Sequence, residues 1–158
     1  MEPKPVADSQ VTTTQLVLPN DTNQLGNLLG GTLMHWMDIA AAIAAQRHCG
    51  RVCVTASVDR LTFHHPIRLG EVVTLQASVN RAFKTSMEVG VRVTAHGNST
   101  APSRRANTAY LTFVAIDEHG HPMPVPQVLP AKGDEQRRFD EALLRREERL
   151  RNRRPDEL

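Results

Sequence analysis

The segment GTLMHWMDIAAAIAAQRH, residues 31–48, carries the helical pattern around which the rest of the chain can be arranged. Its apolar side chains recur at i, i+4, i+7 and i+11, the spacing of one helix face: Leu33, Met37, Ala40 and Ala44. Gly50 follows shortly after and is a natural helix stop. We therefore expect a helix from about Gly31 to His48.

Five alanines crowd this helix: Ala40, Ala41, Ala42, Ala44 and Ala45. Side chains this small allow a β-sheet to approach closely and to wrap the helix. Strand patterns lie on both sides of it in the sequence, at residues 10–18, 52–58, 72–79, 87–93 and 109–115. We expect a connection at 81–85 and a polar loop at 97–105. One long helix beside a meandering antiparallel sheet is an α+β layer pattern.

The two ends of the chain differ from this centre. Residues 1–9 are polar and Pro-rich, so we expect a loose, flexible arm. Residues 122–130 hold four prolines and must be extended. A charged helix is expected from Asp134 to about Arg153, with a narrow apolar stripe at Phe139, Leu143 and Leu150. The predicted organisation is thus the arm, one domain over residues 10–130, and a C-terminal helix and tail over 131–158.

Composition limits the function classes. Aromatic residues make up only 4% of the 158 residues, so the core must use small apolar side chains, which favours a homo-oligomer. The net charge of +2 comes from mixed acids and bases and argues against a nucleic-acid partner. The sequence has no signal-peptide pattern and no membrane-spanning apolar run, so we expect a cytoplasmic protein with no membrane partner.

The two cysteines, Cys49 and Cys53, lie too close in sequence to close a useful loop. Free thiols in a reducing cytosol are the default for such a pair. A zinc site is disfavoured, because no second Cys or His pair at ligand spacing lies nearby. The histidine clusters His64-His65 and His119-x-His121 also lack a carboxylate-plus-His partner, so we expect no metal.

Asp38 is the only Asp, Glu, Lys or Arg between Gly26 and Arg47. Such a carboxylate either lies on the outer strip of the helix or is held in a poorly solvated place, where a carboxylate becomes a stronger base. A purely structural role is the alternative for a lone helix aspartate. The residues that precede it bear on the choice between these interpretations.

Gly30-Gly31 opens the helix with bare backbone, and free N–H groups there can polarise a carbonyl. Asn23, in the preceding loop, carries an amide that can donate and accept. Together with Asp38 these are the parts needed to hydrolyse an acyl compound. Asp38 lies seven residues after Gly31, about 10 Å along the axis, which is too far for both to touch one carbon. A two-fold dimer with antiparallel helices would bring Asp38 of one chain to Asn23 and Gly31 of the other.

Several stretches together resemble the hot-dog-fold acyl-CoA thioesterases of the cytosolic acyl-CoA hydrolase type, which include the YciA-like enzymes of bacteria. The stretches are DTNQLGNLLGGTLMHWMDIA (21–40), RVCVTASVDRLTF (51–63), PIRLGEVV (66–73), KTSMEV (84–89) and PVPQVLP (124–130). The resemblance covers roughly residues 10–140. It implies a hot-dog fold, in which an antiparallel sheet wraps a long central helix.

The resemblance further implies a dimer with one continuous sheet, usually assembled into a hexamer, and acyl-CoA hydrolysis at composite sites. Asp38 falls at the family's catalytic carboxylate, and Asn23 at the loop asparagine that the partner subunit contributes. The thioester carbonyl would sit at the Gly31 helix end, and Asp38 would act as general base or as nucleophile. No cofactor is required, since CoA is part of the substrate and product.

Related enzymes contact CoA at a position that Lys84-Thr85-Ser86 occupies here. Further predicted substrate-binding residues are Gly30, Val54, Thr55, Ala56, His64 and Arg81, with Arg60 and Arg68 as additional cations. A core or interface role is expected for Trp36 and Met37 rather than an acyl tunnel. A hydroxyacyl dehydratase is disfavoured, because residues 19–31 contain no histidine. A non-catalytic acyl-CoA sensor on the same fold stays open.

Overall fold

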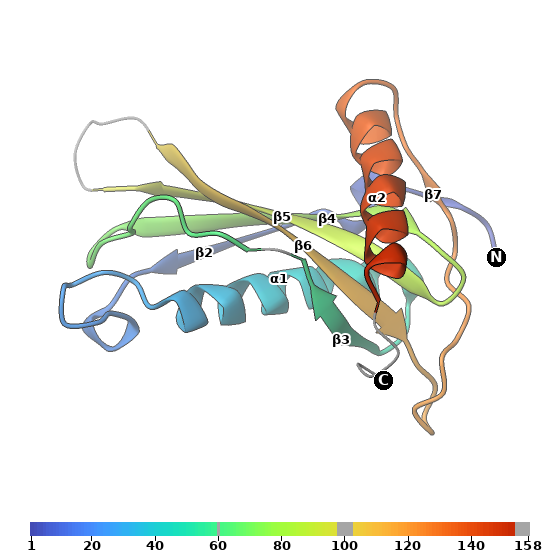
Figure 1. The fold of residues 1–158 in the computed structure, drawn as a ribbon, viewed down its shortest axis with the longest axis horizontal. Helices are drawn as coiled ribbons and strands as arrows, with labels where there is room; N and C mark the ends of the chain where they lie inside the picture. The colour runs from blue at the N-terminus through green and yellow to red at the C-terminus, as the bar shows by residue number, and fades with distance from the viewer. Residues whose placement is uncertain (60, 98–102, 154–158) are drawn as a thin grey trace.

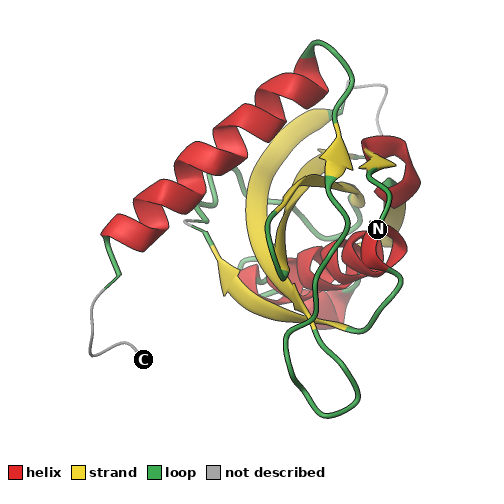
Figure 2. Ribbon diagram, turned by 90° about the vertical axis from the view of Figure 1, so that its right-hand side faces the viewer, coloured by secondary structure: helices red, strands yellow, loops and turns green. Residues whose placement is uncertain are grey.

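The computed structural model describes residues 1–59, 61–97 and 103–153. In these residues, helix α1 (Gly30–Cys49) lies across an antiparallel sheet that curves around it, and helix α2 (Asp134–Arg151) lies on the other side of the sheet (Figures 1 and 2). The strand order is β2-β4-β5-β6-β3. The strands are β2 (Val11–Leu16), β3 (Cys53–Val58), β4 (Val72–Ala82), β5 (Ser86–His96) and β6 (Arg104–Ala115). The expected α+β architecture is confirmed.

Helix α1 is one residue longer at each end than the sequence pattern predicts. It ends where Gly50 adopts a left-handed conformation with φ of +66°, a backbone geometry that glycine reaches without steric cost. The Gly50 N–H donates to the Gln46 carbonyl at 2.8 Å and closes the last turn. The predicted glycine stop is therefore confirmed.

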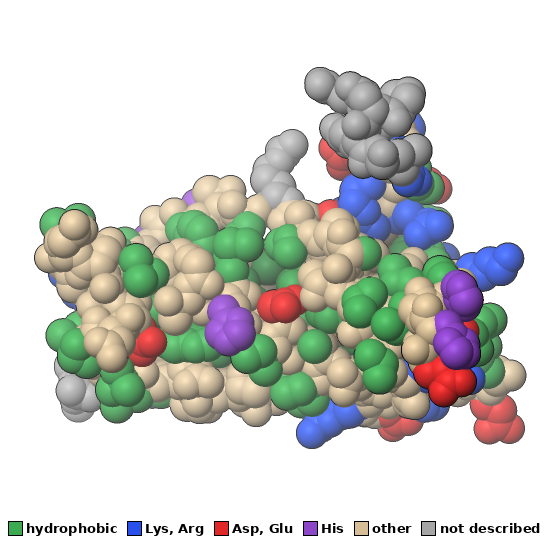
Figure 3. All heavy atoms as spheres, turned by 90° about the horizontal axis from the view of Figure 1, so that it is seen from below, with side chains coloured by type: hydrophobic (Ala, Val, Ile, Leu, Met, Phe, Trp, Pro, Cys, Tyr) green, Lys and Arg blue, Asp and Glu red, His purple; other side chains and the backbone are tan. Residues whose placement is uncertain are grey.

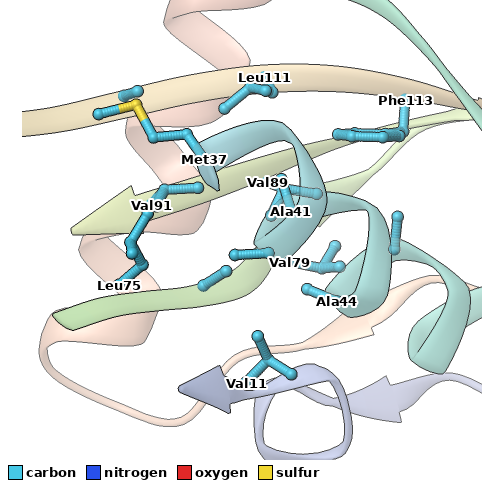
Figure 4. Packing of buried hydrophobic residues seen from close by; sticks show 14 of the residues in the cluster. Val11, Met37, Ala41, Ala44, Leu75, Val79, Val89, Val91, Leu111 and Phe113 are labelled. Atoms are coloured by element: carbon cyan, nitrogen blue, oxygen red, sulfur yellow. The ribbon is translucent and has the colours of Figure 1, made fainter. Parts of the chain in front are cut away.

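The alanines of α1 are the reason that the sheet can approach so closely. Ala40, Ala41, Ala44 and Ala45 are fully buried. They pack against branched side chains from the central strands, and Figure 4 shows Ala41 and Ala44 beside Val79 and Val89. Larger residues at these helix positions would hold the sheet away, because the interior is packed to the density of a molecular crystal.

The hairpin between β4 and β5 is tighter than expected. The predicted connection at 81–85 is wrong for Arg81 and Ala82, which continue β4 beyond an irregularity between Val79 and Arg81. The Phe83 N–H then donates to the Ser86 carbonyl at 2.8 Å. Of the polar loop expected at 97–105, residues 98–102 lie outside the described residues, and Arg104 already belongs to β6.

The expectation of a loose arm at residues 1–9 is wrong. Strand β1 (Lys4–Pro5) pairs in parallel with β7 (Val128–Leu129), and a 3₁₀ helix, η1 (Val6–Ser9), follows it. Val6 is buried, and the Ser9 hydroxyl accepts a hydrogen bond from the Val79 N–H at 2.9 Å. Polar composition did not reveal that two side chains anchor this segment to the core.

Helix α2 meets the sheet through arginines as much as through its apolar stripe. Phe139 and Leu143 are half-buried as the stripe predicts, but Leu150 is exposed, so the stripe is wrong at its C-terminal end. The expected tail beyond Arg153 lies outside the described residues.

A second 3₁₀ helix, η2 (Pro19–Asp21), follows β2. None of the described helices is long and apolar enough to cross a membrane.

Candidate active site

Asp38 lies near the middle of α1 on the side that turns away from the sheet. It is half-buried, and its neighbours on this side include the exposed Met34 and Ile39. Figure 3, which looks onto the underside of Figure 1, shows isolated acidic and histidine side chains among apolar and uncharged groups over its left and middle part, and charged side chains gathered at its right-hand end. Of the two alternatives that the sequence leaves open, the structure places Asp38 on the outer strip of the helix. An apolar strip around a carboxylate suits an uncharged acyl group better than a polar one.

The Asp38 carboxylate accepts a hydrogen bond from the Thr55 hydroxyl, with Thr55 Oγ1 2.6 Å from Asp38 Oδ1. Thr55 belongs to β3, the strand at the edge of the sheet beside α1. The strand register shifts between Thr55 and Ser57, so Ala56 forms a bulge next to this contact. Bulges often re-aim a side chain beside a functional site. The bulge and the hydrogen bond together fix one oxygen of Asp38 and leave the other available.

This contact was missed by sequence reasoning, which assigned Val54, Thr55 and Ala56 only backbone contacts with the substrate. All three are exposed along the edge strand, so those contacts stay a prediction. The Thr55 hydroxyl could not be assigned to Asp38 from spacing, because 17 residues and a chain reversal separate the two.

The start of α1 has the bare backbone that the glycines predict. Leu29 is the N-cap residue, and no side chain of the described residues caps the helix there. A Cβ atom on Gly30 would lie 3.2 Å from the ring of Phe63, so glycine lets this ring approach the helix end. Gly31 has no heavy atom of the described residues within 4 Å of such a Cβ. The space beside Gly31 is therefore open, and the first N–H groups of a helix have no intrahelical partner to compete with a ligand.

Asn23 has a narrower hydrogen-bonding role than expected. Its side-chain oxygen accepts from the backbone N–H groups of Leu25 at 2.9 Å and Asn27 at 3.2 Å. These contacts stabilise the loop that leads into α1. Within the described residues, the exposed NH₂ group has no hydrogen-bond partner and is the part that can face a ligand. Asn23 can thus donate to a carbonyl or to water, whereas its acceptor is occupied.

The remaining predicted binding residues fall at two different ends of the molecule. His64 follows Phe63, whose ring lies beside Gly30, and the backbone of Arg68 forms an isolated antiparallel β-bridge with Asn27. Both residues therefore lie at the Asn23–Gly31 end. Lys84 and Thr85 lie in the turn between β4 and β5, and Ser86 begins β5, near the opposite end of α1 (Figure 1). Asp38 lies between these ends, and one chain therefore does not bring the predicted residues into a single cluster.

The Lys84-Thr85-Ser86 turn is held firmly in place. The Lys84 carbonyl accepts from the Val125 N–H, and the Thr85 carbonyl accepts from the Ala115 N–H, both at 3.1 Å. The Lys84 side chain itself is exposed. A fixed backbone with an exposed cation is a suitable arrangement for binding a phosphate.

Arg81 has a different environment from the one its predicted role requires. Its guanidinium lies 3.9 Å from the centre of the Phe139 ring and donates to the Phe139 carbonyl at 3.1 Å. The side chain is therefore engaged with α2 and is not brought to Asp38. Arg60 lies outside the described residues. Within the described residues, no group of three or more His, Cys, Asp or Glu could hold a metal ion.

A long helix wrapped by a curved antiparallel sheet defines the hot-dog fold. The carboxylate on the open side of this helix, hydrogen-bonded to a hydroxyl, supplies a group that acyl chemistry requires. The thioesterase superfamily profile matches residues 25–101. The uncharacterized acyl-CoA thioester hydrolase YkhA of Bacillus subtilis is 42% identical over 142 residues, which cover 90% of this chain and 83% of that protein. The chain therefore belongs to the thioesterase superfamily, in its acyl-CoA hydrolase group.

Solved structures agree with this assignment. An apo-hexameric acyl-CoA thioesterase has a TM-score of 0.92 at 38% identity and covers 96% of this chain and 97% of its own. The acyl-CoA hydrolase of Staphylococcus aureus, solved with butyryl-CoA and CoA, has a TM-score of 0.88 at 38% identity, covering 94% and 91%. The chain spans only 25% and 37% of the length of two mouse relatives, acyl-coenzyme A thioesterase 11 and cytosolic acyl coenzyme A thioester hydrolase.

Proposed function

We propose that this protein hydrolyses acyl-CoA thioesters to a free acid and CoA. The observation that carries the proposal is the Asp38 carboxylate on the open strip of α1, held by Thr55 at 2.6 Å. Relatives named as acyl-CoA hydrolases support it. The hydrolase of S. aureus has also been solved as aspartate-, asparagine- and threonine-to-alanine mutants, residue types that Asp38, Asn23 and Thr55 present here.

In the proposed reaction, the thioester carbonyl oxygen is polarised by N–H groups at the Gly31 helix end and by the Asn23 amide. Asp38 takes a proton from a water molecule whose oxygen bonds to the carbonyl carbon. Alternatively, an oxygen of Asp38 attacks that carbon, and water hydrolyses the resulting anhydride to the free acid and the Asp38 carboxylate once CoA has left. The carbon–sulfur bond then breaks and CoA leaves as a thiolate, which needs little acid assistance because thiols ionise near pH 8 to 9. Thr55 orients the carboxylate throughout.

The proposed assembly makes this reaction possible. Asp38 and Gly31 lie about 10 Å apart along α1, so we infer a two-fold dimer that brings Asp38 of one subunit to Asn23 and Gly31 of the other. Lys84-Thr85-Ser86 would bind the phosphates of CoA at the mouth of the same site. A hexamer built from three such dimers agrees with the hexameric relative. A cytoplasmic location, where acyl-CoA substrates and free thiols occur together, completes the proposal.

The test is thiol release from a series of acyl-CoAs, from acetyl to palmitoyl, by the native protein and by Asp38→Asn. The substitution keeps the shape and the Thr55 contact but removes the base and nucleophile. We expect rapid hydrolysis by the native protein and a loss of at least about 1,000-fold in the variant, with the oligomer intact by size-exclusion chromatography. Tight acyl-CoA binding without turnover by the native protein would refute hydrolysis and support the sensor.

A further inference from the structure

The connection between α1 and β3 holds a pair of thiols that the proposed reaction does not use. Cys49 is the last residue of α1, and Cys53 is the first residue of β3. The left-handed turn at Gly50 folds the chain back, so that the two Sγ atoms lie 3.0 Å apart. Within the described residues, neither cysteine forms a disulfide. A disulfide bond is about 2.05 Å long, so the sulfurs would have to close by about 1 Å.

The two thiols differ in their access to solvent. Cys49 is partly exposed, whereas Cys53 is buried with 8% of its surface exposed. Each sulfur also lies 3.5 Å from the Arg51 carbonyl oxygen, a contact that holds both side chains on the same side of the turn. A reagent that arrives from solvent therefore meets Cys49 first, with Cys53 directly behind it.

Their chemistry differs in the same direction. A hydrogen bond from the Cys53 thiol stabilises the Cys49 thiolate and lowers the pKa of Cys49. The same hydrogen bond, together with burial, raises the pKa of Cys53. The partial negative charge at the C-terminus of α1 opposes a thiolate, but a direct hydrogen bond acts at much shorter range. Because the thiolate is the nucleophilic form, Cys49 is the attacking thiol and Cys53 is the resolving thiol.

We propose that Cys49 and Cys53 form a thiol–disulfide exchange site that reacts with low-molecular-weight disulfides, with Cys49 attacking and Cys53 resolving. The Cys49 thiolate bonds to one sulfur of the small disulfide, whose S–S bond breaks and releases one thiolate. The Cys53 sulfur then bonds to Cys49, and the mixed disulfide breaks. The second small thiol leaves with the Cys53 proton. Two cysteine thiols are thereby oxidised, and one small disulfide is reduced to two thiols.

The position of the pair gives the exchange a structural consequence. Cys53 lies two residues before Thr55, whose hydroxyl holds Asp38. The intrachain bond would clamp the end of α1 to the start of β3, the two elements that carry this contact. The site is independent of the proposed hydrolysis, and it requires neither acyl-CoA nor turnover.

The test uses the full-length protein and measures its mass and free thiols after exposure to glutathione disulfide. We expect the native protein to lose both thiols and two hydrogen atoms per chain, with no adduct retained, and to recover both thiols after dithiothreitol treatment. Cys53→Ser should retain one glutathione per chain, because nothing resolves the mixed disulfide. Cys49→Ser should react at least about ten-fold more slowly than Cys53→Ser, since its remaining thiol is buried and poorly ionised.

A parallel reaction with CoA disulfide identifies the source of the small disulfide. A faster reaction with CoA disulfide assigns the site to the CoA pool, and equal rates assign it to small disulfides in general. The proposal is overturned if the folded native protein keeps both thiols while the urea-unfolded chain is oxidised. A stable one-glutathione adduct on the native protein would overturn it equally, because Cys53 would then not resolve. Both outcomes are measured on the native chain and do not depend on the folding of a variant.

Discussion

At the scale of single residues, the hydrogen bond from Thr55 to Asp38 is the contact that connects fold to chemistry. Loss of a hydrogen bond to a charged group costs about 1.5–3 kcal/mol, which corresponds to roughly ten- to a hundred-fold in rate if it acts on the transition state. We therefore expect Thr55→Val to lower kcat by that factor with little change in KM, and Thr55→Ser to keep most of the activity.

The readout is steady-state hydrolysis of the best acyl-CoA substrate. Val58→Ala is the matched control, since Val58 is an exposed residue of the same edge strand and has no predicted contact with the substrate. If Thr55→Val and Val58→Ala lower kcat equally, the hydroxyl has no special role in orienting the carboxylate.

The residues of the candidate site could be predicted from sequence where residue type alone carries the information. Asp38 is the one acidic residue of an alanine-rich helix, and Gly30-Gly31 is bare backbone, so the amino-acid sequence by itself identifies both. It does not identify the Thr55 hydroxyl, because that contact depends on the spatial position of a segment 17 residues away. A contact between elements leaves no trace in local spacing.

At the scale of elements, α2 is attached to the sheet by a buried ion pair. Glu88 of β5 is fully buried, and it accepts two hydrogen bonds from Arg145, at 2.7 and 3.0 Å, and one from Asn80 at 3.0 Å. Arg145 also stacks 3.6 Å above the Tyr110 ring. Removal of one partner from such a pair leaves an uncompensated buried charge.

We expect Arg145→Ala to lower the free energy of unfolding by about 3 kcal/mol. The matched control is Arg151→Ala, on an exposed position of the same helix, which should change it by less than about 0.5 kcal/mol. Urea denaturation followed by circular dichroism gives both values. Equal effects of the two substitutions would show that α2 is not held by the Glu88 pair.

A second connection between elements should make stability depend on pH. The buried His48, near the end of α1, lies 2.7 Å through Nε2 from the Pro126 carbonyl oxygen, and Nδ1 has no hydrogen-bond partner in the described residues. Burial lowers the pKa of His48 below its ordinary value of 6.5. The unfolded chain therefore binds a proton more readily than the folded one. Stability is fully present above pH 6.5 and is lost as the pH falls through that value towards the folded-state pKa.

We expect the free energy of unfolding to fall between pH 7 and pH 5.5, and this slope to flatten in His48→Gln. Carboxyl groups titrate mainly below this window. Glu71 is one example: partial burial opposes its ionisation, but hydrogen bonds from Arg104 and from the Arg68 backbone outweigh burial and lower its pKa. Urea denaturation at several pH values measures the slope. An unchanged slope in His48→Gln would assign the pH dependence to other groups.

Most of the elements were predictable, because helices and buried strands impose a period on the sequence. The ends were not. The N-terminal arm is anchored by the buried Val6 and the Ser9 hydroxyl, two small contacts in a polar segment. Helix α2 packs through arginine side chains, which a count of apolar residues treats as solvent-facing. Composition therefore underestimates how firmly a segment is attached to the core wherever polar side chains make the contacts.

At the scale of the whole molecule, the proposed composite site makes a prediction about mixed assemblies. Neither Asp38→Ala nor Asn23→Ala should form a complete site in its own homodimer. In a mixed dimer, one site receives native Asp38 from one chain and native Asn23 from the other. Random pairing makes about half of all dimers mixed, each with one of its two sites complete, so co-expressed variants should recover about a quarter of native activity.

Thiol release by the co-expressed proteins, against each variant alone, measures this recovery. Co-expression of two copies of the same variant is the control for expression level. If the site were contained in one chain, no mixture of the two variants would restore it, and the activity would stay at the level of the single variants.

The position of Asp38 within α1 also limits which genetic changes the protein can accept. Insertion of one residue before Asp38 would turn the rest of the helix by about 100° and advance it by about 1.5 Å. That turn would move the carboxylate off the open strip and rotate Ala40 and Ala44 out of the core in a single step. Substitutions in the helix can be compensated by repacking of neighbouring side chains, whereas an insertion or deletion cannot. We expect insertions and deletions among natural variants to avoid α1 and to gather in segments such as 116–127, which no helix period constrains.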